Sequence, residues 1–141
     1  MCGLHTKYNG ETNNDITATL NDAIIVPFCP EQLAGFSTPR EKITLIGGDG
    51  FAILKGKGRV VNESGKDVTE NILRAVLECK KLIKIIHPDY IILKEGSPSC
   101  GVNLTNINWQ KEKGSGVICA LLKPVSYTHL RAHETRHELV C

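Results

Sequence analysis

The sequence predicts an α/β fold with a mostly parallel sheet. Two apolar runs, Ala23 to Val26 and Tyr90 to Leu93, are typical of buried strands, and each is followed by a turn in which cysteine lies beside proline or glycine. A segment with apolar residues at helical spacing ends directly before the second run. A helix followed by a strand is half of a βαβ unit, whose strands are parallel.

Length and composition indicate one ordinary globular domain. The chain has 141 residues, 41% of them hydrophobic and 23% charged, which is enough for a single modest core. The net charge of +2 and the absence of a basic run indicate neither a nucleic-acid nor a membrane partner. No signal-peptide core or bilayer-spanning run is found, so we expect a cytoplasmic location. In that reducing compartment, six cysteines favour thiols, metal ligands or redox groups over disulfides.

Five short segments are predicted to be strands. Each combines apolar or β-branched residues with turn-forming residues at its ends. In chain order they are Ala23–Phe28, Ile43–Ile46, Phe51–Leu54, Arg59–Asn62 and Tyr90–Leu93. The third and fourth are separated by a stretch around Gly56 and Gly58, so we expect them to form a small antiparallel excursion.

The main helix is predicted from Asp67 to about Ile86. Asp67 suits the N-cap, and Glu70 follows three residues later, close to a capping box. Apolar residues then recur at helical spacing. His87 and Pro88 end the helix, because proline cannot continue it.

The other segments give weaker signals. Gln32 to Lys42 is predicted to be a loop or short helix, and Val102 to Lys113 a polar loop. Val117 to Leu122 is apolar and follows Gly114-Ser115-Gly116, which predicts a loop leading into a helix. Such a glycine-rich helix start either binds an anion or is a simple connecting turn.

Two turns carry the candidate chemistry. Cys29 lies in the turn Val26 to Glu31, and Cys100 lies in the turn Ser97 to Gly101. Ligands of open α/β sheets bind outside the carboxyl ends of the strands, so both thiols are expected to face one crevice. Thiolates are the usual ligands of iron–sulfur clusters, and we expect such a cluster here. The alternative is that both cysteines are buried structural thiols.

Polar residues near these thiols are candidates for catalysis. Glu31 could exchange a proton with a substrate, or it could be an ordinary carboxylate at a helix start. Ser97 and Ser99 either orient a substrate carbonyl or form the turn around proline. Arg40 either binds an anionic group or pairs with Glu31 or Glu41.

The remaining cysteines and histidines favour structural roles. Cys79 and Cys119 occupy apolar positions of predicted helices and are expected in the core. His133 to His137 matches the zincin pattern H-E-x-x-H, but only four residues follow it, too few for a third ligand and a cleft. Ser126 to Cys141 also resembles a translated sequencing adapter. We therefore interpret residues 124–141 as a non-native tail and residues 1–123 as the domain.

The ordered motifs resemble the DUF523 family, which includes the thiouracil desulfurases. The resemblance covers about Gly3 to Lys123, and the Cys-Pro-Glu and Ser-Pro-Ser-Cys-Gly segments are its most specific parts. The matching segments are Gly3–Gly10, Val26–Glu31, Gly35–Arg40, Gly65–Thr69, Leu93–Gly101 and Gly114–Leu122.

This resemblance implies a single Rossmann-like α/β domain with a [4Fe-4S] cluster held by only three cysteines. The fourth iron would then take sulfur from a thiocarbonyl, as in the conversion of 2-thiouracil to uracil. On the matching positions, Cys29 and Cys100 would be cluster ligands, Glu31 the acid/base residue, and Ser97 a residue that positions a thiolated base.

The start of the chain departs from the family pattern. The family's first cysteine would match a position before Met1, and Cys2 lies one residue before Gly3 at a neighbouring position. We therefore expect that the first strand and the first ligand are lost, with Cys2 as the candidate substitute. The sequence leaves open whether the shortened chain is active.

Three functions are compatible with these residues. The first is an iron–sulfur-dependent desulfurase acting on a small thiolated molecule. The second is a non-enzymatic iron–sulfur or thiol-based binding module. The third is a cysteine-nucleophile enzyme using Cys29 with Glu31, although neither His5 nor His87 is placed beside them by any sequence signal. The oligomeric state and the natural substrate are not determined by the sequence.

Overall fold

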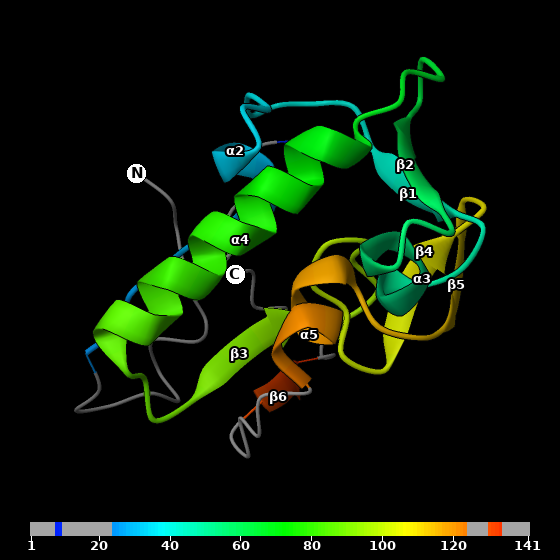
Figure 1. The fold of residues 1–141 in the computed structure, drawn as a ribbon. Helices are drawn as coiled ribbons and strands as arrows, with labels where there is room; N and C mark the ends of the chain where they lie inside the picture. The colour runs from blue at the N-terminus through cyan, green and yellow to red at the C-terminus, as the bar shows by residue number, and fades with distance from the viewer. Residues whose placement is uncertain (1–7, 10–23, 124–129, 134–141) are drawn as a thin grey trace.

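The computed structural model describes residues 8–9, 24–123 and 130–133 (Figure 1). The helices are α2 (Pro30–Leu33), α3 (Gly50–Leu54), α4 (Thr69–Ile86) and α5 (Val117–Leu122). The strands are β1 (Ile43–Ile46), β2 (Arg59–Asn62), β3 (Ile91–Lys94), β4 (Leu104–Ile107), β5 (Gln110–Lys113) and β6 (Leu130–His133). The predicted α/β class is confirmed.

The described strands form one four-stranded and one two-stranded sheet. The larger sheet has the order β2-β1-β4-β5, in which only the β1–β4 pair is parallel. In the smaller sheet β3 pairs with β6 in parallel, Ile91 lying opposite Leu130. The mixed larger sheet therefore does not confirm the predicted mostly parallel, Rossmann-like sheet. The antiparallel excursion exists, but the partner of β2 is β1.

Strand β6 lies within the segment interpreted as a non-native tail. Of the H-E-x-x-H pattern, only His133 belongs to the described residues. The division into a domain of residues 1–123 and a tail stays a prediction.

Residues 51–54 are helical, so their assignment as a strand was wrong. Asp49 occupies the N-cap of α3, and its Oδ1 accepts a hydrogen bond from the Phe51 N–H at 3.1 Å. Asp49 Oδ2 also accepts one from the Ser115 N–H at 3.2 Å, which ties α3 to the start of α5. This capping chemistry outweighs the weak strand preference of a five-residue apolar segment.

The segment before Cys29 is not a strand in residues 24–28, contrary to the prediction. Ile24 is 97% exposed and Val26 is 50% exposed. Pro27 has no N–H to donate to a neighbouring strand, and Pro30 has none either. The segment therefore extends toward α2 without the ladder that would make it a strand.

Residues 102–113 form a β-hairpin where the sequence predicted a polar loop. Along β4 the side chains alternate between half-buried and buried, as expected of a strand with one face on the core. Strand β5 is exposed and charged, which hid its strand character from the hydrophobic pattern. The two strands are joined by Asn108 and Trp109, both of which have positive φ angles.

The main helix is confirmed, with its first residue slightly later than predicted. Helix α4 begins at Thr69, with Val68 at the N-cap, and ends at Ile86, with His87 at the C-cap in the left-handed conformation. Glu70 makes no side-chain hydrogen bond in the part of the chain that the structure describes, so the predicted capping box is not completed.

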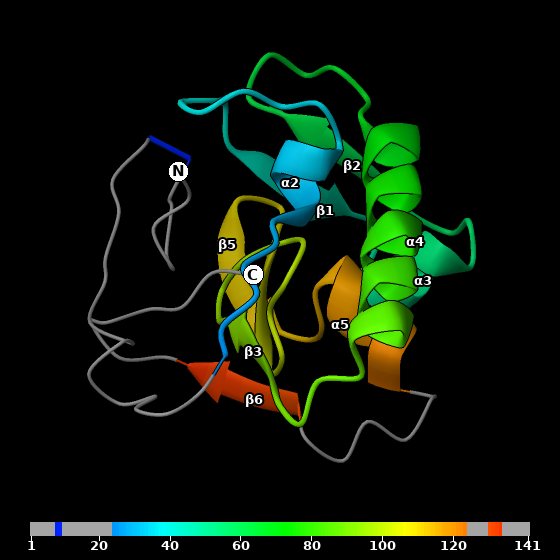
Figure 2. The same cartoon turned by 90° about the vertical axis from the view of Figure 1, so that its left-hand side faces the viewer.

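The core lies between the sheet strands and the helices α3, α4 and α5, which gather on one side in Figure 2. Helix α5 contacts both α3 and α4, and α2 packs against α4. Within the described ranges, none of the helices has the length and apolarity needed to cross a membrane. The principal core residues are Ile43, Leu45, Ile53, Val60, Ile72, Val76, Ile83, Leu93, Ile107, Val117, Ile118 and Leu122.

We predict a pH-dependent contribution of Asp67 to stability. Hydrogen bonds from the Thr69 side chain and N–H lower the pKa of Asp67 from its ordinary value of 3.8. The stabilisation is therefore present above pH 3.8 and is lost as the pH falls through the lower folded-state pKa. Because Asp67 is exposed, Asp67→Ala should lower the free energy of unfolding at pH 7 by about 1 kcal/mol or less.

Denaturant titrations at pH 7 and at pH 2.5 would measure this contribution. The difference between the wild type and Asp67→Ala should shrink in acid. An equal difference at both pH values would contradict the assignment.

Candidate functional site

The two cysteine turns meet at one cavity of about 370 Å³. Cys29 and Cys100 are both buried and both line it, as the sequence predicted for a shared crevice. The lining includes the six residues singled out as candidates in the two turns and at Arg40: Cys29, Glu31, Arg40, Ser97, Ser99 and Cys100. The structure thus brings together all the predicted site residues that it describes; Cys2 lies outside the described residues.

Cys29 is placed by the start of α2. It occupies the N-cap with an extended backbone, and Pro30 begins the helix with its φ angle already fixed. The chain therefore turns sharply at Cys29, and Glu31 enters the same cavity from the first turn of the helix.

Cys100 is placed by backbone hydrogen bonds between its turn and the start of α5. The N–H groups of Gly116, Val117 and Ile118 donate to the carbonyls of Gly101, Pro98 and Ser99, at 2.7, 3.1 and 2.9 Å respectively. These donors are occupied by the protein itself. The glycine-rich segment before α5 is therefore a connecting turn rather than an anion site.

Gly116 allows the close contact between α5 and the cysteine turn. A Cβ atom there would lie 2.5 Å from the Cys100 nitrogen and 2.6 Å from the Gly101 nitrogen, closer than real Cβ atoms approach. The position therefore requires glycine for steric reasons.

Glu95 holds the other side of the same turn. Its buried carboxylate oxygen Oε1 accepts hydrogen bonds from the N–H groups of Val102, Asn103 and Leu104 at 2.6, 2.9 and 3.2 Å. Backbone N–H groups are suitable partners for a buried carboxylate, which would otherwise be costly to desolvate. The Ser97–Gly101 turn is thus fixed from both sides.

Glu31 connects the two cysteine turns. Although only 8% exposed, it has a partner for each carboxylate oxygen. Ser99 Oγ donates to Oε1 at 3.0 Å, and Arg40 Nε donates to Oε2 at 2.7 Å. Of the two pairings considered for Arg40, the one with Glu31 is found.

The serines extend this connection toward Cys100. Ser97 Oγ lies 3.0 Å from Ser99 Oγ and accepts a hydrogen bond from the Cys100 N–H at 3.2 Å. Because the Ser99 proton is given to Glu31, the Ser97 hydroxyl must donate to Ser99. The result is a directed chain from the Cys100 N–H through Ser97 and Ser99 to Glu31.

The electrostatics of Cys29 reflect opposing influences. Burial raises the pKa of the Cys29 thiol above its ordinary value, and the nearby Glu31 carboxylate raises it further. The Gln32 N–H and the Arg40 guanidinium, whose terminal nitrogen lies 3.8 Å from Sγ, act in the opposite direction. Arg40 therefore provides positive charge that favours a thiolate.

The donor set matches an iron–sulfur cluster in kind. Two cysteine sulfurs border one partly enclosed cavity, and thiolates are the ligands such clusters use. Among the described residues there is no group of three or more His, Cys, Asp or Glu side chains that could hold a metal ion. A third cysteine ligand would thus have to come from outside the described residues, where the candidate Cys2 lies.

Cys79 and Cys119 are core residues, as predicted. Both are fully buried free thiols, and neither lines the cavity. Burial raises the pKa of Cys79 to about 12, so its thiol is neutral and inert at ordinary pH. Burial also raises the pKa of Cys119.

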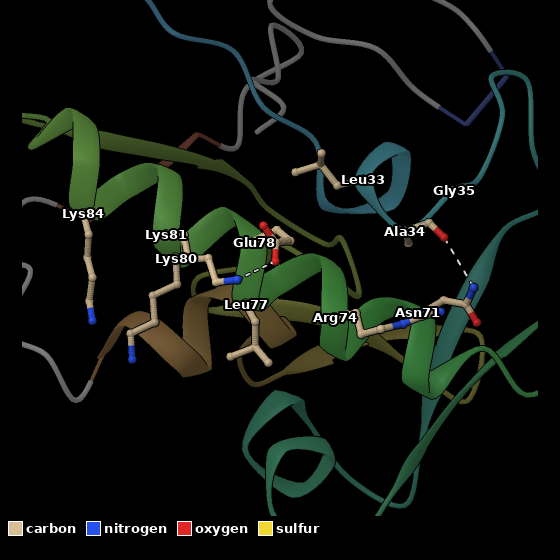
Figure 3. Close-up of a pocket in the computed structure, with 10 residues that line it drawn as sticks. All are labelled: Leu33, Ala34, Gly35, Asn71, Arg74, Leu77, Glu78, Lys80, Lys81 and Lys84. Carbon is tan, nitrogen blue, oxygen red and sulfur yellow. Dashed lines mark hydrogen bonds and ion pairs between the residues drawn. The ribbon is translucent and has the colours of Figure 1, made fainter.

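A larger cavity, of about 640 Å³, lies between α2 and α4 (Figure 3). Its wall carries basic residues and the exposed Leu77, and Glu78 pairs with Lys81 at 2.8 Å. In Figure 3 the side chains of Lys80 and Lys84 extend away from the helix. None of its lining residues is a cysteine, so it is not the candidate site, although it is the larger of the two cavities.

Sequence reasoning missed several residues of the smaller cavity. Trp109, Asn106 and Lys42 all line it, yet two of them lie in the segment taken for a polar loop. A two-residue Asn-Trp step between short runs of extended residues was the available signal for a hairpin.

We predict that Gly116→Ala displaces the Cys100 turn. Overpacking against backbone atoms should lower the free energy of unfolding by about 1–3 kcal/mol, measured by denaturant titration. Gly56→Ala is the control, because only its positive φ is unfavourable and nothing lies within 4 Å of its Cβ. Gly116→Ala should also perturb the environment of Cys100, whereas Gly56→Ala should not. Equal effects of both variants on Cys100 would contradict the close-contact argument.

Comparison with known proteins finds a matching family and a similar solved structure. A family model for 2-thiouracil desulfurase matches residues 1–134. The uncharacterized protein YbbK of Bacillus subtilis (strain 168) is 38% identical over 137 residues, covering 94% of this chain and 91% of that protein. A solved structure, the [4Fe-4S]-dependent thiouracil desulfidase TudS, aligns with a TM-score of 0.70 and 27% identity, covering 93% of this chain and 84% of its own.

These matches extend over the two cysteine turns and the elements that support them, and they agree with the resemblance to DUF523 noted from the motifs. The chain therefore belongs to the 2-thiouracil desulfurase family.

Proposed function

We propose that this protein is an iron–sulfur-dependent desulfurase that removes sulfur from a small thiolated base such as 2-thiouracil. The observation that carries the proposal is the meeting of Cys29, Cys100 and Glu31 at one cavity, with hydrogen bonds running between the two turns. Family membership and the similarity to a [4Fe-4S]-dependent thiouracil desulfidase support the same chemistry.

Cys29 and Cys100 would hold a [4Fe-4S] cluster, with Cys2 as the candidate third ligand. Such a cluster, when bound through three cysteines, supplies a Lewis-acidic iron for the sulfur of the thiocarbonyl. Arg40 assists the ligand role of Cys29, because its guanidinium is 3.8 Å from Sγ and stabilises the thiolate that metal binding requires.

Glu31 would serve as the proton acceptor and donor. Exchange of sulfur for oxygen requires that a water attack the thiocarbonyl carbon, that the carbon–sulfur bond break, and that both water protons be transferred so that sulfur leaves as hydrogen sulfide. Ser97 lines the cavity, and two hydrogen bonds lead from it through Ser99 to Glu31. A proton from a water at Ser97 can reach the carboxylate along this chain.

Arg40 would keep Glu31 in position during this exchange. Its Nε bonds one carboxylate oxygen and leaves the other facing Ser99. The terminal nitrogen Nη1 of Arg40 donates a hydrogen bond to Thr38 Oγ1 at 2.9 Å, which limits the movement of the guanidinium. The carboxylate is therefore oriented toward the serines before substrate arrives.

A cysteine-nucleophile enzyme is less well supported. That hypothesis pairs Cys29 with Glu31, but it lacks a partner histidine to activate the thiol, because none of the described residues that line the cavity is a histidine. His87 instead forms the C-cap of α4.

The test is anaerobic reconstitution with iron and sulfide, followed by analysis of bound iron and an ultraviolet–visible spectrum. We expect a coloured protein that releases sulfide from 2-thiouracil and forms uracil. A colourless, iron-free protein would contradict the cluster. A coloured protein without sulfide release would indicate the binding module instead.

Two cysteine variants test whether Cys100 is a cluster ligand and Cys119 only a core residue. Cys100→Ala should bind little or no iron, because it removes a ligand. Cys119→Ala removes an equally buried cysteine that lies outside the cavity, and it should retain both colour and turnover. Equal iron content in the two variants would remove Cys100 from the ligand set.

Two glutamate variants, one in the cavity and one outside it, test the acid/base role of Glu31. Glu31→Gln should keep the cluster and lower kcat by about 10²- to 10⁴-fold, the usual contribution of a general acid/base. Glu41→Gln is the matched control, because Glu41 bonds Asn62 and Ser64 outside the cavity. Full turnover in Glu31→Gln would exclude Glu31 from the mechanism.

A further inference from the structure

We propose that Trp109 and Asn106 recognise the planar ring of the substrate, with the indole stacking on the ring and the Asn106 amide donating to a ring carbonyl. The inference rests on the proposed function and specifies its substrate as a thiolated pyrimidine-type heterocycle. It would exclude thiocarbonyl compounds that lack a flat ring.

Both side chains border the cavity that contains the cysteines. Trp109 lines it together with Cys29, Glu31 and Cys100, and it remains 46% exposed. A large aromatic side chain left half open to water gains little from the core. Its exposed surface is available to a flat ligand, and base stacking is sequence-tolerant because every base has a π-face.

The backbone at Trp109 is unfavourable for any residue with a side chain. Asn108 and Trp109 form the two-residue link between β4 and β5, with φ angles of 50° and 67°. Hairpin links of this kind strongly prefer Asn-Gly. Tryptophan therefore occupies a position that favours glycine, and strain of this kind concentrates at functional sites.

Thr44 forms hydrogen bonds with both Trp109 and Asn106. It is fully buried in β1. Its hydroxyl accepts a hydrogen bond from the backbone N–H of Trp109 at 2.9 Å and donates one to Asn106 Oδ1 at 2.5 Å. The Asn108 N–H also donates to the Leu45 carbonyl at 3.0 Å. These bonds fix the hairpin link against the adjacent strand.

The hydrogen bond from Thr44 to Asn106 determines which atom of the Asn106 amide can bind a ligand. Since Oδ1 accepts from Thr44, the donor nitrogen remains, and it makes no hydrogen bond within the described residues. Asn106 thus offers N–H donors at the cavity, where the substrate presents carbonyl or thiocarbonyl acceptors. A stacking face and a donor on one wall match a flat ring with acceptors on its edge.

The decisive variant is Trp109→Gly, because it removes the indole while relieving the backbone. We expect an unfolding midpoint equal to or above that of the wild type, unchanged iron content, and a KM for 2-thiouracil raised by about 5- to 150-fold with little change in kcat. Trp109→Phe keeps an aromatic ring and should stay close to the wild type. Asn106→Asp keeps the acceptor for Thr44 but loses the donor, and it should also raise KM.

Binding can be measured without turnover, because Trp109 is the single tryptophan of the chain. Uracil, which lacks sulfur, should change its emission saturably in the reconstituted protein. An unchanged KM in folded, iron-loaded Trp109→Gly, or no response to uracil, would overturn the inference while sulfide release still upheld the proposed function. A saturable response without sulfide release would uphold ring recognition and reject the desulfurase.

Discussion

The backbone hydrogen bonds between the Ser97–Gly101 turn and the first turn of α5 are the contact on which the site depends. They use helix N–H groups that would otherwise lack partners, and they need a glycine at position 116 because the backbones touch. Glu95 holds the turn from its other side through three further N–H groups. Cys100 is consequently presented by a rigid backbone, which is a suitable basis for a metal ligand.

Glu31 converts two separate turns into one site. Its carboxylate is buried with Arg40 on one oxygen and Ser99 on the other, so neither charge is left without a partner. Buried ion pairs of this kind contribute little net stability, since desolvation offsets their attraction. Their value here is positional, because the same bonds that satisfy the charge also orient the carboxylate along the serine chain toward Cys100.

The cavity lining includes a residue in an unfavourable backbone conformation. Trp109 adopts a conformation that glycine would occupy at lower cost, and Thr44 supplies the hydrogen bond that keeps it there. Cys79 and Cys119, by contrast, sit in the core as neutral thiols with raised pKa values. The surroundings of a cysteine, and not its residue type, therefore distinguish the candidate site cysteines from those of the core.

Local patterns were sufficient to predict the α/β class, β1, β2, α4 and α5. The spacing of apolar residues, and the prolines and glycines that end helices and strands, can be read from neighbouring residues in the chain. They also singled out Cys29, Glu31, Ser97 and Cys100 as candidate site residues, because the motifs that contain these residues are local. Patterns failed for residues 24–28 and 51–54, where strand character requires a partner, and for β5, whose charged side chains carry no hydrophobic signal. Only the tertiary structure decided that Arg40 pairs with Glu31, that Ser99 joins the two turns, and that Trp109 and Asn106 line the same cavity as Cys29 and Cys100. These contacts join residues that are separated along the chain.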